Sequence, residues 1–240
     1  MPNVLNTSIR FLTFRSTREE LLNVGGRHLA FGLVCTWIVG IGRYWDNPRV
    51  SVFQHLGLGS IVYSFALALL LYLIVLPLRK KEWSYFRVLT FVSLVSPPAV
   101  LYAIPVERYF DIDTANTINV CFLGIVAVWR VALLVFYLRR FGALDWITVV
   151  TVTLLPLTLI VVTLTILNLD RVVFDFMGGI IRSTRSGNDD AYAILFLLSV
   201  LSFLLFVPVL TCYIILTLST VISRREARQS QLSITNDTTK

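Results

Sequence analysis

Long, nearly uncharged runs of apolar residues constrain this chain more than any other feature of its sequence. Five runs approach or exceed 20 residues, at positions 61–78, 88–106, 120–138, 147–167 and 191–218. A helix needs about 20 apolar residues to cross the hydrocarbon core of a bilayer, because each residue adds about 1.5 Å along its axis. The runs therefore predict membrane-spanning helices and an all-α fold.

The composition excludes a water-soluble globular protein. Of the 240 residues, 56% are hydrophobic and 15% are charged, whereas soluble domains average roughly 45 to 50% and 25%. The three cysteines, Cys35, Cys121 and Cys212, fall within apolar segments and show no short pairing pattern. We expect them to be small buried apolar side chains rather than parts of a disulfide or a metal site.

A sixth apolar stretch, at positions 29–41, is shorter than the others, and the distribution of charge indicates how it is used. Cytoplasmic loops collect Lys and Arg. If this stretch spans, 14 of the 21 Lys and Arg residues fall on the side of both termini and six on the other, with Arg130 inside a span. If it does not span, they divide ten against ten. We therefore predict a polytopic bundle of six spans with both termini cytoplasmic; five spans are the alternative.

Aromatic residues at the ends of the predicted spans fit the same layout. Tyr44, Trp45 and Tyr109 fall at predicted outer boundaries, whereas Tyr85 and Trp146 fall at predicted inner ones. Tyr and Trp prefer the two membrane interfaces, so this placement agrees with six spans.

The topology divides the chain into three regions. Residues 1–28 form a cytoplasmic amphipathic segment, residues 29–218 the transmembrane bundle, and residues 219–240 a polar cytoplasmic tail, which we expect to be disordered. Anionic lipids at the cytoplasmic face account for the net charge of +7 without nucleic acid. Other membrane proteins, or a second copy of the chain, are further expected partners.

The N-terminal segment contains a candidate helix start. Ser16 and Glu19 fit a capping box, in which each side chain satisfies a backbone N–H at the first turn. Upstream, apolar residues alternate with Arg10 and Arg15. This pattern suits a helix lying on an anionic lipid surface, or alternatively a frayed tail that carries topogenic charge.

The sequence contains none of the motifs that would indicate a catalytic site. Zinc-protease, serine-hydrolase, phosphate-loop, CxxC and dinucleotide-binding patterns are all missing. We accordingly expect no catalytic residue, no cofactor and no metal ion. Glu107, Asp111 and Asp113 lie in one loop, but nothing fixes the six or more oxygen ligands that Ca²⁺ requires, so we interpret them as solvated.

Arg130 is the charged residue predicted to lie inside a span, about 12 Å from its cytoplasmic end. Burying a guanidinium at that depth costs a few kcal/mol unless acceptors bond its N–H groups. In the preceding span, Pro97 and Pro98 free the carbonyls of Ser93 and Leu94. Arg130 either caps that break or binds an anionic group such as a lipid headgroup or a substrate carboxylate.

Two further groups of polar residues accompany Arg130. Threonines 148, 151, 158 and 165 form a lane along the fifth predicted span, used for helix packing or for a hydrophilic pathway. The candidate polar core comprises Arg130, Asn119, Ser93, Ser96, Pro97, Pro98, Thr151 and Thr158. The candidate outer-interface cluster, in the stretch GIGRYWDNPR, comprises Arg43, Tyr44, Trp45 and Asp46.

The segment AVWRVALLVFYLRRFGALDWITVV joins an aromatic-bearing span, a basic end, a short turn containing glycine and another span. This order resembles the middle of the Yip family, the Ypt-interacting proteins and their bacterial relatives, and FLTFRSTREELL is similar to the amphipathic lead of the bacterial members. The resemblance implies a compact helical membrane bundle with a cytoplasmic N-terminus, and it carries over no catalytic residue. The short first helix departs from the five-span plan of that family.

These observations favour a bacterial-type inner-membrane protein that acts as a scaffold, a lipid-interacting protein or an accessory subunit without catalysis. The alternative is a small transporter or channel that uses Arg130 and the threonine lane. An intramembrane enzyme is the third reading, disfavoured because paired catalytic groups are missing from the sequence.

Overall fold

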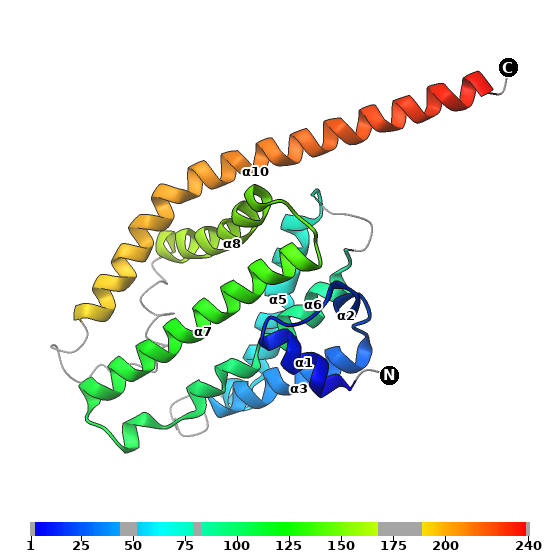
Figure 1. The fold of residues 1–240 in the computed structure, drawn as a ribbon. Coiled ribbons are helices and arrows are strands. Elements are labelled where there is room, and N and C mark those ends of the chain that lie inside the picture. The colour runs from blue at the N-terminus through cyan, green and yellow to red at the C-terminus, as the bar shows by residue number, and fades with distance from the viewer. Residues whose placement is uncertain (1–2, 44–51, 79–82, 168–188, 239–240) are drawn as a thin grey trace.

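The computed structural model of this chain is all-helical in the residues that it describes, 3–43, 52–78, 83–167 and 189–238 (Figure 1). Its elements, in chain order, are α1 (Val4–Leu12), α2 (Arg18–Leu22), α3 (Gly26–Gly42), α4 (Val52–His55), α5 (Leu58–Val75), α6 (Tyr85–Leu94), η1 (Pro97–Ala103), η2 (Val106–Arg108), α7 (Ile112–Arg140), α8 (Trp146–Ile166) and α10 (Asp189–Thr238). The two η elements are 3₁₀ helices.

Helices of membrane-spanning length lie at the predicted positions. Four segments are long and apolar enough to cross a bilayer: Leu58–Val75, Thr114–Arg140, Trp146–Ile166 and Phe196–Glu226. A fifth is the pair formed by α6 and η1, if this bent pair is a single span. The remaining predicted span corresponds to α3, a shorter apolar helix of 17 residues. The fold is thus that of a helical integral membrane protein with four to five candidate spans, and six spans are not confirmed.

The break between α6 and η1 falls at the predicted proline pair. The helix α6 ends at Leu94, Pro97 begins η1, and the two axes are bent by 42°. Neither proline can donate the backbone hydrogen bond that would continue the α-helix, and the chain tightens into a 3₁₀ helix that suits proline in its first turn. The bend directs the end of η1 toward α7, which it contacts.

The N-terminal segment packs into the bundle instead of lying apart from it. The helix α2 begins one residue later than expected, because Thr17 is the N-cap and forms a capping box with Glu20. The predicted box of Ser16 with Glu19 is therefore wrong. Phe11 of α1 is 2% exposed, with its ring centroid 5.7 Å from that of Phe91 in α6. The α1–α2 hairpin is thus held by apolar packing as well as by charge.

Two groups of helices make up the bundle, and α7 runs between them (Figure 1). On one side, α3, α5 and α6 pack against one another; on the other, α8 packs against α10. The core on the α6 side is built from stacked aromatic rings. Tyr137 lies between Phe91 and Phe141, at centroid distances of 4.2 and 4.9 Å.

The last helix differs from its prediction. We expected a disordered tail after the last span, but α10 continues to Thr238 and extends past the other helices (Figure 1). Pro156 and Pro208 both lie inside helices, α8 and α10. Of the cysteines expected to be buried, Cys121 is exposed and Cys35 and Cys212 are partly buried. An exposed Cys121 on an apolar span is compatible with contact to lipid.

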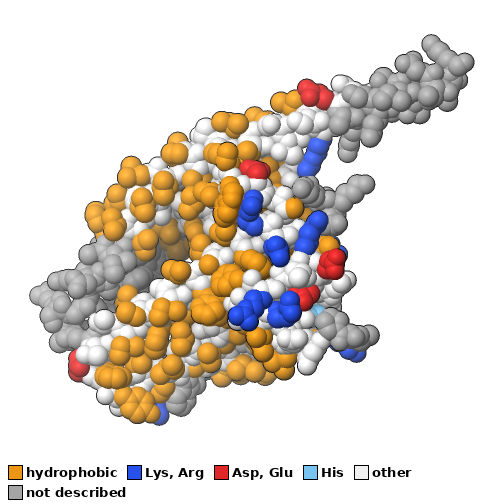
Figure 2. Space-filling view, in the orientation of Figure 1, with side chains coloured by type: hydrophobic (Ala, Val, Ile, Leu, Met, Phe, Trp, Pro, Cys, Tyr) orange, Lys and Arg blue, Asp and Glu red, His pale blue; other side chains and the backbone are white. Residues whose placement is uncertain are grey.

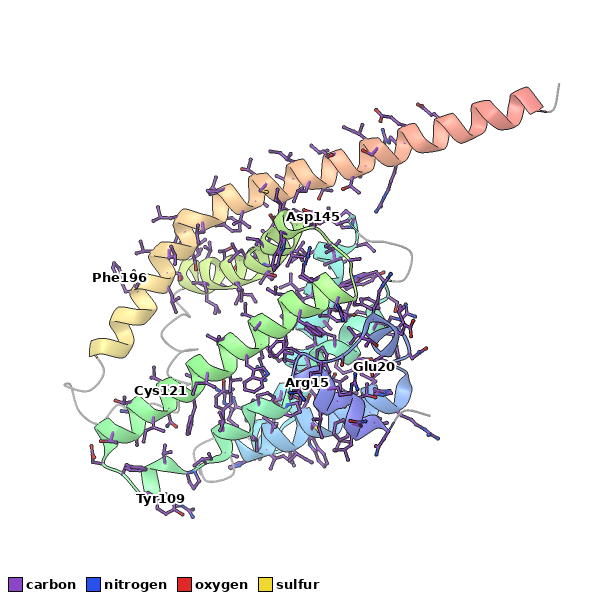
Figure 3. All side chains as sticks on the ribbon, in the orientation of Figure 1. Arg15, Glu20, Tyr109, Cys121, Asp145 and Phe196 are labelled. Atoms are coloured by element: carbon purple, nitrogen blue, oxygen red, sulfur yellow. The ribbon has the colours of Figure 1, made fainter. Side chains whose placement is uncertain are left out.

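Charge is unevenly distributed over the surface. Figure 2 shows most of the visible Lys and Arg side chains gathered toward the end that carries α2 and the end of α7, while apolar side chains cover much of the rest. Tyr109 and Cys121 lie at one end of the bundle, and Glu20 and Asp145 lie toward the other (Figure 3). Tyr109, predicted at an outer boundary, thus lies at the end of the bundle opposite Asp145, the residue that directly precedes the predicted inner-boundary residue Trp146 (Figure 3).

Candidate polar sites within the bundle

The helices α3 and α6 approach each other closely, and polar groups come together at their contact. A Cβ atom on Gly32 would lie 2.7 Å from the Cβ of Ser93, so only glycine fits at this position without movement. One turn later, Thr36 donates to the carbonyl of Gly32 at 2.9 Å and lies 2.9 Å from the Oγ of Ser96. Small residues spaced by four are typical of helices that pack closely within membranes.

The Ser93 carbonyl freed at the proline break accepts from nearby hydroxyls. Ser96 donates to the carbonyl oxygen of Ser93 at 2.6 Å, and the Thr36 hydroxyl lies 3.5 Å from the same oxygen. No hydrogen bond from Arg130 to Ser93 or Leu94 is found in the described part of the chain. Nearer hydroxyls thus receive the Ser93 carbonyl, and no hydrogen bond among the described residues supports the predicted cap by Arg130.

Arg130 belongs instead to a different polar cluster. It lies on the stripe of α7 that contains Val126 and Leu133, which are 1% and 0% exposed, so its side chain starts from the protein-facing side. It is partly buried. The charged or titratable groups that act on it are Tyr102 of η1, Tyr63 of α5 and Arg43 at the end of α3.

This cluster joins two sets of residues that the sequence kept apart. Arg43 was assigned to the outer-interface cluster and Arg130 to the polar core. The guanidinium of Arg43 lies over the ring of Tyr102, 5.2 Å from its centroid, which is within the range of a cation–π interaction. Tyr44, Trp45 and Asp46, the other members of the outer-interface cluster, lie outside the described residues.

Asn119 does not share this site. It is partly buried, on the same helix as Arg130, but the two residues are 11 positions apart, which corresponds to about 16 Å along the axis. Ser93, Ser96, Pro97 and Pro98 belong to the α3–α6 contact and the bend. The predicted polar core is thus divided among separate places in the fold.

The threonine lane of α8 faces its neighbour α10. Thr151 and Thr158 are 5% and 4% exposed. Thr151 donates to the carbonyl of Ile147 at 2.8 Å, and its hydroxyl lies 3.3 Å from the sulfur of Cys212 in α10. Thr165 bonds the carbonyl of Val161 and lies 3.3 Å from the hydroxyl of Ser199. These contacts use the hydroxyls for helix packing.

An open groove borders this lane between α8 and α10. It has a volume of about 400 Å³ and an apolar exposed lining. Its lining residues are Trp146, Ile147, Val150, Thr151, Leu154, Pro208, Val209 and Cys212. An apolar groove of this kind does not offer a hydrated path for a polar solute.

Two acidic residues, Asp111 and Asp145, are N-caps of the helices that follow them. Asp111 caps α7 by accepting from the amide of Thr114 at 3.1 Å and from its hydroxyl at 2.8 Å. Asp145 caps α8 in the same way through Thr148. The hydroxyl and the amide of Thr148 donate to the Asp145 carboxylate and hold its pKa below the ordinary value. Among the described residues, no group of three or more His, Cys, Asp or Glu is placed to hold a metal ion.

Sequence reasoning missed four residues of these sites: Gly32, Thr36, Tyr63 and Tyr102. A signal for the first two was present, because Gly32, Thr36 and Gly40 follow one another at intervals of four in α3. No comparable local signal marks Tyr63 or Tyr102, which lie far from Arg130 in the sequence.

Comparison with protein-family models, with curated proteins and with solved structures finds no match for this chain.

Proposed function

We propose that this chain is a six-span protein of the bacterial cytoplasmic membrane, with both termini in the cytoplasm, that acts without catalysis as a scaffold, a lipid-interacting protein or an accessory subunit. The contacts made by the threonine lane are the observation that supports this proposal. The hydroxyls of Thr151 and Thr165 contact Cys212 and Ser199 of α10, and the groove beside Thr151 is apolar, which favours packing over transport.

The sixth span in this proposal is α3. Its small residues face its neighbours: Gly32 approaches Ser93, and a Cβ on Gly40 would lie 2.8 Å from the hydroxyl of Ser60. Its opposite face is apolar and open, since Val34 and Ile38 are 50% and 57% exposed. A helix resting on a membrane surface would instead carry a charged face, so this pattern supports a span.

A labelling experiment tests this topology. In a variant whose three native cysteines are replaced by alanine, Asn47→Cys is expected to react with an impermeant maleimide added to intact cells, and Gln229→Cys is expected to react only after lysis. Labelling of the cysteine at position 47 only after lysis contradicts six spans and favours five.

A second experiment tests the proposed role against its alternative. The full chain is purified from native membranes with its lipids retained, and proteins present in stoichiometric amount are identified. A defined partner or a stable homo-oligomer, with no solute or ion flux in sealed proteoliposomes above that of protein-free vesicles, supports the proposal. Flux that is lost in Arg130→Gln contradicts it and supports a transporter or channel.

A further inference from the structure

The open groove between α8 and α10 begins at an aromatic residue of the predicted membrane boundary. Its wall on α8 runs from Trp146 to Leu154, eight positions that correspond to about 12 Å along the axis. Its wall on α10 contains Pro208 and Cys212. The exposed lining is apolar, and the volume is about 400 Å³. Such a groove suits a slender apolar group and offers nothing to a polar solute.

Positive charge lies at the Trp146 end of this groove. The guanidinium of Arg139 lies over the Trp146 ring, 4.5 Å from its centroid, within the range of a cation–π interaction. One N–H of Arg139 donates to the Leu144 carbonyl at 3.0 Å. Arg139 and the following Arg140 are both exposed. A guanidinium has five donors, so a single bond to Leu144 does not exhaust them.

The carboxylate next to this end of the groove has another use. Asp145 directly precedes Trp146, and it accepts from the amide and the hydroxyl of Thr148 at 3.0 and 2.7 Å as the N-cap of α8. Among the described residues, Asp145 forms no ion pair with Arg139 or Arg140. Two arginines against one carboxylate leave this end of the groove with an excess of positive charge.

An apolar groove with a positively charged end matches the two parts of an anionic phospholipid. An acyl chain is slender and apolar, and phosphate oxygens match the planar fork of a guanidinium. Tryptophan prefers the interface where these two parts of a lipid join, and Trp146 both lines the groove and contacts Arg139. A partner helix about 10 Å wide would occupy roughly 900 Å³ over the same length, more than twice the volume of the groove.

We propose that the α8–α10 groove binds one acyl chain of an anionic phospholipid, and that Arg139 and Arg140 bind the phosphate of its headgroup beside Trp146. This inference deepens the lipid-interacting role proposed above and rests on it, because it requires the Trp146 end to lie at a membrane interface. The Trp146 ring and the Leu144 carbonyl hold Arg139 in place, so the charge is positioned before the lipid arrives.

Native mass spectrometry of the purified full chain in detergent tests the role of the groove. Phosphatidylglycerol is titrated against wild type, Val150→Trp and Val128→Trp. Val150 lines the groove, so an indole there fills it, whereas Val128 is an exposed apolar residue of α7 outside the groove. Val150→Trp should weaken binding about fivefold or more, because the acyl chain loses its contacts with the wall. Val128→Trp should change it less than about twofold. Equal affinities of the two variants overturn the proposal.

The role of the charge is tested by lipid preference. Wild type should bind phosphatidylglycerol about fivefold or more tightly than zwitterionic phosphatidylcholine, and Arg139→Gln should lose most of that preference. Arg15→Gln is the control, since Arg15 is exposed and lies away from Asp145 and hence from the Trp146 end (Figure 3). An unchanged preference in Arg139→Gln overturns the proposal. Val150→Trp retains Arg139, so the groove is tested even if Arg139→Gln does not fold.

The same measurement detects a second copy of the chain as the occupant. A dimer that forms in wild type, is lost in Val150→Trp and does not respond to phosphatidylglycerol overturns the proposal. Loss of lipid selectivity together with the expected labelling of Asn47→Cys and Gln229→Cys overturns this inference alone. Solute flux through proteoliposomes contradicts the proposed function and leaves the binding result as measured, so the two failures are distinguishable.

Discussion

The contact of α3 with α6 and the surroundings of Arg130 show two ways of placing polar groups among apolar helices. At the first, the Thr36 and Ser96 hydroxyls find acceptors within one turn, and Gly32 lets the two backbones approach. At the second, Arg130 meets two tyrosines and another arginine without a hydrogen bond in the described chain. The first arrangement is complete by itself, whereas in the second the described residues give the Arg130 guanidinium no hydrogen-bond acceptor.

The difference lies in what each group needs. A hydroxyl can bond a carbonyl of its own helix, so it is satisfied wherever the helix places it. A guanidinium has five donors and no acceptor capacity, so it needs oxygens from outside its own helix. Stability should therefore depend more on the α3–α6 contact than on Arg130.

The largest expected effect is at the contact of α3 with α6. Gly32→Ala adds a methyl group 2.7 Å from the Cβ of Ser93, and we expect the free energy of unfolding to fall by about 1 to 3 kcal/mol. Gly124→Ala is the control, because nothing lies within 4 Å of its Cβ position; it should be neutral, or stabilising by up to about 1 kcal/mol. Reversible unfolding in mixed micelles measures both. Equal stability of the two variants would show that α3 and α6 are not in tight contact.

A smaller loss is expected when a hydroxyl is removed at the same place. Thr36→Val deletes the group shared by Gly32 and Ser96, and should lower the free energy of unfolding by about 1 kcal/mol. Thr211→Val is the control, since that exposed hydroxyl bonds the Val207 carbonyl of its own helix. A double-mutant cycle with Ser96→Ala should give a coupling of about 0.6 kcal/mol. Zero coupling would contradict a shared network.

Asp145 is a charged residue with hydrogen-bond donors beside it, and in this it differs from Arg130. The bonds from Thr148 lower the pKa of Asp145 in the folded state. Its contribution is therefore fully present above the unfolded-state pKa of about 3.9 and is lost as pH falls through the lower folded pKa. Asp145→Ala should reduce stability by about 0.5 to 1 kcal/mol at pH 7, and the gap to wild type should narrow in acid. A gap that is independent of pH would show that the charge of Asp145 does not matter.

The smallest effect on stability is expected at Arg130. In zwitterionic detergent without added lipid, Arg130→Leu should accumulate normally and unfold within about 0.5 kcal/mol of wild type, because no hydrogen bond is lost. Arg139→Leu is the comparison, since Arg139 donates to the carbonyl of Leu144 at 3.0 Å and lies 4.5 Å from the ring of Trp146. It should lose about 1 kcal/mol. A greater loss in Arg130→Leu than in Arg139→Leu would assign Arg130 a structural role.

Much of the fold could be predicted because its causes are local. Length and apolarity located the helices, and the proline pair located the bend. The predicted capping box is displaced by one residue, because Ser16 with Glu19 and Thr17 with Glu20 both match the capping-box pattern. With Thr17 as the N-cap, Leu21 is 6% exposed and Ser16 is 1% exposed. Packing against the rest of the bundle therefore selects between the two possible capping boxes.

The sites were harder to predict because they join distant parts of the chain. Arg130 meets Tyr102 only because the bend turns η1 toward α7. The extent of α10 was missed for a different reason. Polar composition indicated a disordered tail, but a helix that is already formed extends without a new nucleation step, and Arg, Glu, Ala and Gln are good helix formers.

The length of α10 also sets a distance. Its apolar segment ends at Glu226 and the helix continues to Thr238, so 12 further residues extend about 18 Å. A domain or label attached at that end would be held away from the lipid by a rigid spacer. Shortening the spacer by whole helical turns would reduce its reach in steps of about 5.4 Å while keeping its direction.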